Sequence, residues 1–145
     1  SKPALGASTI IVENGRILRI DSGATAPVGA RVVDLRGKTV MPGLIDAHVH
    51  LTGDAGTPFW REAVDTDEYA TLVGAKNALV IARAGFTTIR ELGSAQFSGF
   101  ALRDAIAQGL VPGPRVVAAG QAISIVGGHG DVNGFRANVL KAMDG

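Results

Sequence analysis

One stretch of the sequence, MPGLIDAHVH at residues 41–50, decides how the rest of the chain is interpreted. Its residues 43–50 are mostly apolar, which is typical of a β-strand covered on both faces. Side chains at i and i+2 of a strand point to the same face, so His48 and His50 lie side by side. Two imidazoles at the carboxyl end of a parallel strand can share one cation, and βα folds carry active sites at that end. The spacing alone also fits two surface or hydrogen-bonded histidines.

A helix is predicted after this strand. Asp65 is placed to cap its first turn, with Glu68 three residues on, and Gly85 stands where a helix commonly ends. Apolar residues at helical spacing predict the face that packs against the core. They are Leu72, Val73, Leu79 and Val80.

The same order of elements then repeats. Residues 86–92 read as a second strand, Ser98 is predicted to cap a helix that runs to Gln108 and ends at Gly109, and residues 114–120 read as a third strand. Strands that alternate with helices predict right-handed crossovers and a parallel sheet. A further helix could begin at Phe135.

The first forty residues differ from the rest because they predict hairpins. Two β-rich runs, 9–13 and 16–20, flank Asn14-Gly15, which is a strong signal for a type I′ turn. A second pair, 30–35 and 38–40, flanks Arg36-Gly37. We therefore predict two parts, a β-hairpin layer over residues 1–40 and a βα repeat over residues 41–145.

Composition excludes several classes of protein. The chain has 145 residues, 46% of them apolar, so a disordered chain is not expected and the length suits one ordinary domain. It contains no Cys, which excludes disulfide scaffolds, cysteine-ligated zinc and thiol nucleophiles. A formal charge of +1 without a basic block argues against nucleic acid, and no apolar run suggests a membrane span. The compartment stays open: the cytoplasm is favoured, and the periplasm is possible if a leader was removed.

With its context, the stretch 41–50 strongly resembles the signature of the amidohydrolase superfamily. Residues 12–17 and 33–38 resemble that family's small β-sandwich, and residues 85–93 resemble its second barrel strand. The resemblance implies an α/β fold, namely the first three βα units of a (β/α)8 barrel after part of a β-sandwich. It also implies that His48 and His50 bind a divalent metal ion. Zinc is the first choice because neutral imidazole suits it.

A third histidine, His129, lies in the glycine-rich segment 127–131. This segment resembles the loop after the third barrel strand in the branch that holds imidazolonepropionase-like proteins and prolidase-like dipeptidases. The resemblance implies that His129 binds substrate, as a donor to the scissile carbonyl or to a carboxylate. The alternative is an exposed histidine on a mobile loop.

Charged residues near the histidines are weaker candidates. Asp46 is at even spacing to both, so we expect it on their face, as an acceptor that orients a ligand or as a buried carboxylate below the site. Asp54 could line the pocket, although acids on loops are usually solvated. For Arg90 and Glu91 we expect a structural ion pair, with one of the two facing the barrel interior.

The remaining ligands that the resemblance implies have no counterpart here. A binuclear amidohydrolase needs a bridging carboxylated Lys, two later His and an Asp as general base, and Lys141 falls in a predicted helix rather than a strand. A closed barrel also takes about 250 residues. We therefore expect an N-terminal fragment whose partner is the remainder of the same hydrolase, and no catalytic residue is assigned within it.

The resemblance implies a metal-dependent hydrolase of an amide or peptide bond, acting on a dipeptide or an N-acyl amino acid through metal-activated water. A hydrolase of cyclic amides, of the imidazolonepropionase type, is the alternative. From a different class, a non-catalytic scaffold relative or an inactive fragment also fits. The expected partners are a small-molecule or peptide substrate and, when the protein is complete, further copies in a homo-oligomer.

Overall fold

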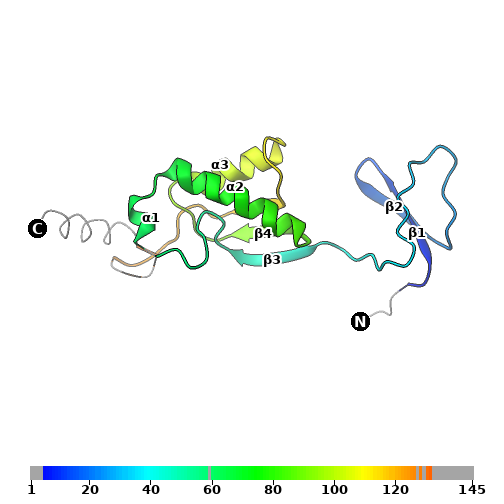
Figure 1. The fold of residues 1–145 in the computed structure, drawn as a ribbon, viewed down its shortest axis with the longest axis horizontal. Helices are drawn as coiled ribbons and strands as arrows, with labels where there is room; N and C mark the ends of the chain where they lie inside the picture. The colour runs from blue at the N-terminus through cyan, green and yellow to red at the C-terminus, as the bar shows by residue number, and fades with distance from the viewer. Residues whose placement is uncertain (1–4, 59, 127, 129, 132–145) are drawn as a thin grey trace, which may run out of the picture. The chain divides into compact units, whose positions relative to one another are not determined.

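The computed structural model describes residues 5–58, 60–126, 128 and 130–131, and it is a mixed α/β structure (Figure 1). The chain divides into two compact units, Ser1–Pro42 and Gly43–Gly145. Each unit is described by itself.

The first unit contains one antiparallel hairpin. Strand β1 (Ser8–Glu13) pairs with β2 (Arg16–Ser22). Asn14 and Gly15 between them have φ values of 50° and 74°. Two consecutive residues with positive φ are what a type I′ turn requires, so the prediction for this hairpin is confirmed.

The second predicted hairpin does not form among the described residues. The turn at Arg36-Gly37 is present, with Lys38 N donating to Leu35 O at 2.9 Å, but no strand flanks it. The Asp34 carboxylate accepts a hydrogen bond from the Arg36 backbone N–H at 3.0 Å and also pairs with the Arg36 guanidinium. A side chain that bonds the backbone locally competes with the ladder of a sheet, which accounts for the error.

The second unit is built on a parallel sheet, as predicted. Its strands β3 (Leu44–Val49), β4 (Phe86–Glu91) and β5 (Arg115–Ala118) lie in the order β3-β4-β5. Helices α2 (Asp67–Arg83) and α3 (Ser98–Ala107) connect them and lie on one side of the sheet, and a short α1 (Arg61–Val64) precedes α2 (Figure 1). None of the helices in the described ranges combines the length and the apolar character needed to cross a membrane.

The core lies between these two helices and the sheet, and the face that α2 turns toward it differs from the prediction. Leu72 and Val80 are 70% and 60% exposed, whereas Gly74 and Ala78 are buried. A Cβ at position 74 would lie 2.8 Å from Leu102 Cδ2, so the close packing of α2 on α3 admits only small residues there. The buried apolar residues of this core are Leu51, Ala78, Ile89, Leu102 and Val116.

Both predicted helix caps are displaced by one residue. Thr66 caps α2 by accepting a hydrogen bond from Tyr69 N at 3.2 Å, because the Asp65 carboxylate is taken by Arg61 at 2.7 Å. Ser98 is the first residue of α3 and its hydroxyl donates to Ala95 O at 2.5 Å. The predicted helix ends at Gly85 and Gly109 are confirmed by φ values of 97° and 74°.

The pairing of β3 with β4 is interrupted twice. Leu44 pairs with Phe86 but Ile45 pairs with Thr88, so Thr87 is an extra residue in β4. Asp46 then pairs with Ile89 and Val49 with Glu91, so β3 has one residue more than β4 over that interval. The second interruption cancels the first, and its interval contains His48.

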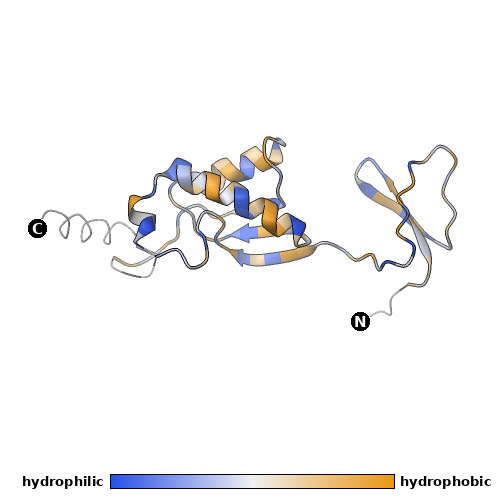
Figure 2. Cartoon of the chain, viewed as in Figure 1, coloured by the Kyte–Doolittle hydropathy of each residue, from blue (hydrophilic) through white to orange (hydrophobic). Residues whose placement is uncertain are grey.

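The sheet face that does not carry the helices is uncovered in the described part of the chain. Ile45 is 72% exposed and Val117 is 54% exposed. Figure 2 shows the apolar residues along β3 and on both helices in orange. Within the described residues, the helices therefore cover only one face of the mostly apolar run at 43–50.

Candidate metal centre

The two histidines of the sequence motif lie together at the carboxyl end of β3. His48 is the penultimate residue of β3, and His50 is the first residue after the strand. Their ring centroids are 5.4 Å apart, with 72° between the ring planes. His48 N donates to Asp46 Oδ1 at 3.0 Å, which ties the backbone just before the pair. Two neighbouring imidazoles at this end of a parallel strand are the arrangement that the sequence predicts.

The hydrogen bond of His50 decides which of its nitrogens is free. Its Nδ1 lies 2.9 Å from Gly93 O. A carbonyl oxygen only accepts, so Nδ1 carries the proton, and in the neutral ring Nε2 keeps its lone pair. The side chain is 56% exposed, so Nε2 is accessible to a ligand or a metal ion.

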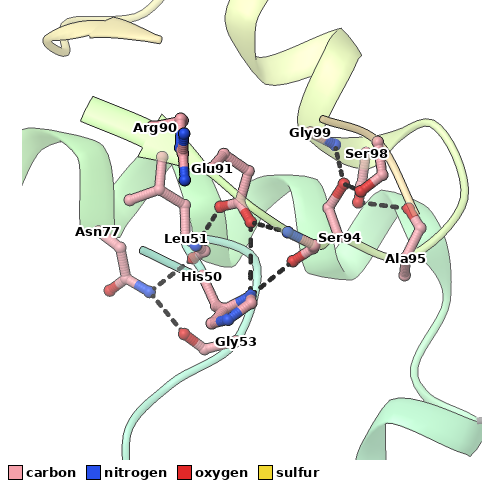
Figure 3. A network of polar contacts seen from close by, with 12 residues as sticks. His50, Leu51, Gly53, Asn77, Arg90, Glu91, Ser94, Ala95, Ser98 and Gly99 are labelled. Atoms are coloured by element: carbon pink, nitrogen blue, oxygen red, sulfur yellow. Dashed lines mark hydrogen bonds and ion pairs between the residues drawn. The ribbon is translucent and has the colours of Figure 1, made fainter. Parts of the chain in front are cut away.

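A buried carboxylate supports this arrangement from the neighbouring strand (Figure 3). Glu91 ends β4 and its side chain is 1% exposed. Leu51 N donates to its Oε2 at 2.5 Å and Gly93 N donates to its Oε1 at 3.0 Å, while Oε1 lies 3.6 Å from His50 Nδ1. Burial raises the pKa of Glu91 above its ordinary value, and the two backbone N–H groups and His50 act in the opposite direction.

Helix α2 holds the segment after His50 from the other side. Asn77 Nδ2 donates to Leu51 O at 2.9 Å and to Gly53 O at 3.1 Å. Lys76 Nζ lies 2.6 Å from Asp54 Oδ2, and this contact lowers the pKa of the Asp54 carboxyl. The Leu51 peptide is therefore bonded through both its N–H and its C=O. The Asp54 carboxylate forms an ion pair with Lys76.

The expectations for Asp46, for the pair Arg90 and Glu91, and for His129 have different outcomes. Because an extra residue interrupts the ladder after Asp46, even spacing does not place Asp46 on the face of the histidines, and its carboxylate bonds the backbone instead. The prediction of an ion pair between Arg90 and Glu91 is wrong. Arg90 Nε donates to Ala47 O at 3.0 Å, whereas the Glu91 carboxylate accepts hydrogen bonds from two backbone N–H groups. His129 lies outside the described residues.

Asn77 is the residue that sequence reasoning missed. A polar amide within the expected buried side of a helix, 26 residues after Leu51, is a weak signal without knowledge of what the helix faces. In the described ranges, no group of three or more His, Asp or Glu side chains forms a metal site. Two imidazoles are thus the candidate ligands that this part of the chain brings together.

Comparison with known proteins identifies the family. The sequence model of the amidohydrolase family matches residues 39–145. The chain belongs to the amidohydrolase family. Among solved amidohydrolase structures, a Xaa-Pro dipeptidase with bound methionine is 35% identical with a TM-score of 0.74, over 86% of this chain and 31% of its own. A prolidase complexed with N-methylphosphonate-L-proline is 33% identical with a TM-score of 0.78, over 88% of this chain and 30% of its own.

Curated relatives include dihydroorotases. That of Geobacter sulfurreducens is 48% identical over 65 residues, which are 45% of this chain and 15% of the relative. That of Bacillus thuringiensis is 39% identical over 83 residues, 57% of this chain and 16% of the relative. This amidohydrolase chain therefore spans about a sixth of the length of these relatives, and the resemblance found in the sequence is confirmed at the level of the family and its prolidase-like branch.

Proposed function

We propose that the protein containing this chain is a metal-dependent hydrolase of an amide or peptide bond, with a dipeptide or an N-acyl amino acid as substrate. The observation that carries the proposal is the pair His48 and His50, with rings 5.4 Å apart and Nδ1 of His50 on a carbonyl oxygen. The structural likeness to a Xaa-Pro dipeptidase and to a prolidase supports a peptide-like substrate.

The donor set fits a divalent cation. Neutral imidazole is a good ligand for zinc, which is our first choice, and Nε2 of His50 keeps its lone pair. A bound divalent ion would polarise the scissile carbonyl and lower the pKa of water. This chain's own part is to hold the two imidazoles at the strand end and to fix the ring of His50. His129 is proposed to donate a hydrogen bond to the substrate.

We further infer that the sheet β3-β4-β5 is the start of a (β/α)8 barrel and that the hairpin of residues 1–40 belongs to a β-sandwich. A closed barrel takes about 250 residues, and the solved relatives named above are about three times longer than the matched part. The general base and the other metal ligands would come from the remainder of the hydrolase. The complete protein is proposed to form a homo-oligomer. An active natural gene product of 14.8 kDa would contradict this inference.

A second candidate is a hydrolase of cyclic amides, which the matches to dihydroorotases favour. Turnover of a panel that contains dipeptides, N-acyl amino acids and cyclic amides distinguishes the two. A scaffold relative without activity would turn over none of them and would bind no metal.

The test is the metal content of the natural gene product and of its variants. Replacing both His48 and His50 by alanine should remove the bound divalent metal, as measured by elemental analysis, and abolish turnover. The matched control is His129→Ala, which should keep the metal and raise KM. Unchanged metal content in the variant without His48 and His50 would refute the assignment.

A further inference from the structure

One buried carboxylate connects the ends of two neighbouring strands. Glu91 belongs to β4, yet one of its oxygens accepts the N–H of Leu51, which follows β3. Its other oxygen accepts the N–H of Gly93, which lies two residues after the end of β4. Both acceptor oxygens of a 1% exposed side chain are thus occupied by backbone donors.

These bonds close a ring that includes the His50 imidazole. The carboxylate of Glu91 fixes the N–H of Gly93, and the carbonyl of Gly93 accepts the Nδ1–H of His50 at 2.9 Å. The peptide that follows His50 returns to Glu91 through Leu51 N. The ring therefore restrains His50 at two points, its backbone and its Nδ1 (Figure 3).

We propose that Glu91 is a positioning residue for His50, which keeps Nδ1–H on the Gly93 carbonyl and thereby directs Nε2 toward the cation. The proposal rests on the proposed function, because it assigns His50 as a metal ligand. Partners that hold the second nitrogen of a ligating imidazole fix its tautomer and its ring orientation. Here the partner is the backbone carbonyl of Gly93, which Glu91 holds on one side through Gly93 N, while Ser94 N donates to Gly120 O at 3.0 Å on the other side.

The two backbone N–H donors explain why position 91 holds a residue with a carboxylate group. Leu51 N and Gly93 N are both donors, so each needs an acceptor oxygen. Glutamine has one such oxygen, and its NH2 group would face the other N–H. Aspartate has two oxygens on a side chain that is one methylene shorter. Neither substitute satisfies both donors in the observed geometry.

The experiment compares Glu91→Gln with Glu68→Gln in the natural gene product. Glu68 is an exposed glutamate in the first turn of α2, so the same chemical change is made away from the site. Zinc affinity is measured by competition with a chromophoric chelator after removal of bound metal. We expect Glu91→Gln to bind zinc about 10- to 100-fold more weakly. We expect Glu68→Gln to match the wild type.

A second readout tests positioning directly. In the metal-free protein, long-range 1H–15N spectra report which His50 nitrogen carries the proton, with the signals assigned by their loss in His50→Ala. The wild type should show the Nδ1–H tautomer, and Glu91→Gln should show a mixture of both tautomers. A residue with a merely structural role would leave this tautomer unchanged.

The outcomes separate this proposal from the proposed function. If Glu91→Gln keeps both the wild-type zinc affinity and the Nδ1–H tautomer of His50, Glu91 is not a positioning residue. If the wild type binds no metal, the proposed function fails, while the tautomer comparison still tests Glu91. If Glu91→Gln does not fold, Glu91→Asp is measured instead, and wild-type zinc affinity in that variant overturns the proposal.

Discussion

Replacing Asn77 by leucine removes the amide that joins α2 to the segment after His50. Leucine is similar in volume, so the change deletes two hydrogen bonds and leaves little empty space. The carbonyl oxygens of Leu51 and Gly53 lose their donor. Leu51 is 1% exposed, so water does not reach its carbonyl easily.

The size of the effect follows from the burial of these two acceptors. An acceptor that is left unpaired in a buried position costs about 1 to 3 kcal/mol, and a lost hydrogen bond in a partly exposed position costs about 1 kcal/mol. We therefore expect Asn77→Leu to lower the free energy of unfolding by about 2 to 4 kcal/mol. Since the same segment begins at His50, the proposed binding of zinc should weaken as well.

The assay is urea unfolding of the metal-free natural gene product, followed by circular dichroism. The matched control is Lys76→Met, which removes the neighbouring contact from α2 to the same segment. Its partner Asp54 is 40% exposed and Lys76 is 57% exposed, so this loss should be small. An Asn77→Leu protein with the wild-type unfolding midpoint, or a Lys76→Met protein as unstable as Asn77→Leu, would refute the reasoning.

Two further predictions concern close packing and pH. A Cβ at position 43 would lie 2.7 Å from Thr87 Cβ, so Gly43→Ala should cost about 1 to 3 kcal/mol in urea unfolding. Adding Thr87→Gly should recover part of this loss, and strictly additive effects would show that the two positions do not clash. Lys76 lowers the pKa of Asp54, so their contact stabilises the fold above the ordinary pKa of 3.8 and is lost as the pH falls below it. Asp54→Asn should therefore melt below the wild type at pH 7, and the difference should close in acid; a difference that grows in acid would contradict this sign.

The features that sequence reasoning predicted correctly depend on local signals. The Asn14-Gly15 turn follows from the two residues that tolerate positive φ, and the helix ends follow from Gly85 and Gly109. The parallel order of β3, β4 and β5 follows from the alternation of strands and helices. The motif at 41–50 led to the family, and the match to residues 39–145 confirms it.

The errors depend on what each residue meets in space. The buried face of α2 is set by the close approach of Leu102 to Gly74, which hydropathy along the helix does not reveal. Asp65 is not a cap because Arg61 occupies its carboxylate. The roles of Asn77 and Glu91 also depend on partners that are distant in the sequence. Asn77 donates to Leu51 O, 26 residues earlier, and Glu91 accepts from Leu51 N, 40 residues earlier.

The two interruptions in the pairing of β3 and β4 restrict how these strands can change in length. A one-residue shift of register turns every following side chain to the opposite face of a sheet. The extra residue Thr87 in β4 is compensated by the extra residue in β3 between Asp46 and Val49. A deletion in one strand alone would put the residues that follow it out of register with the other strand, so among related sequences gaps in these two strands should occur in pairs.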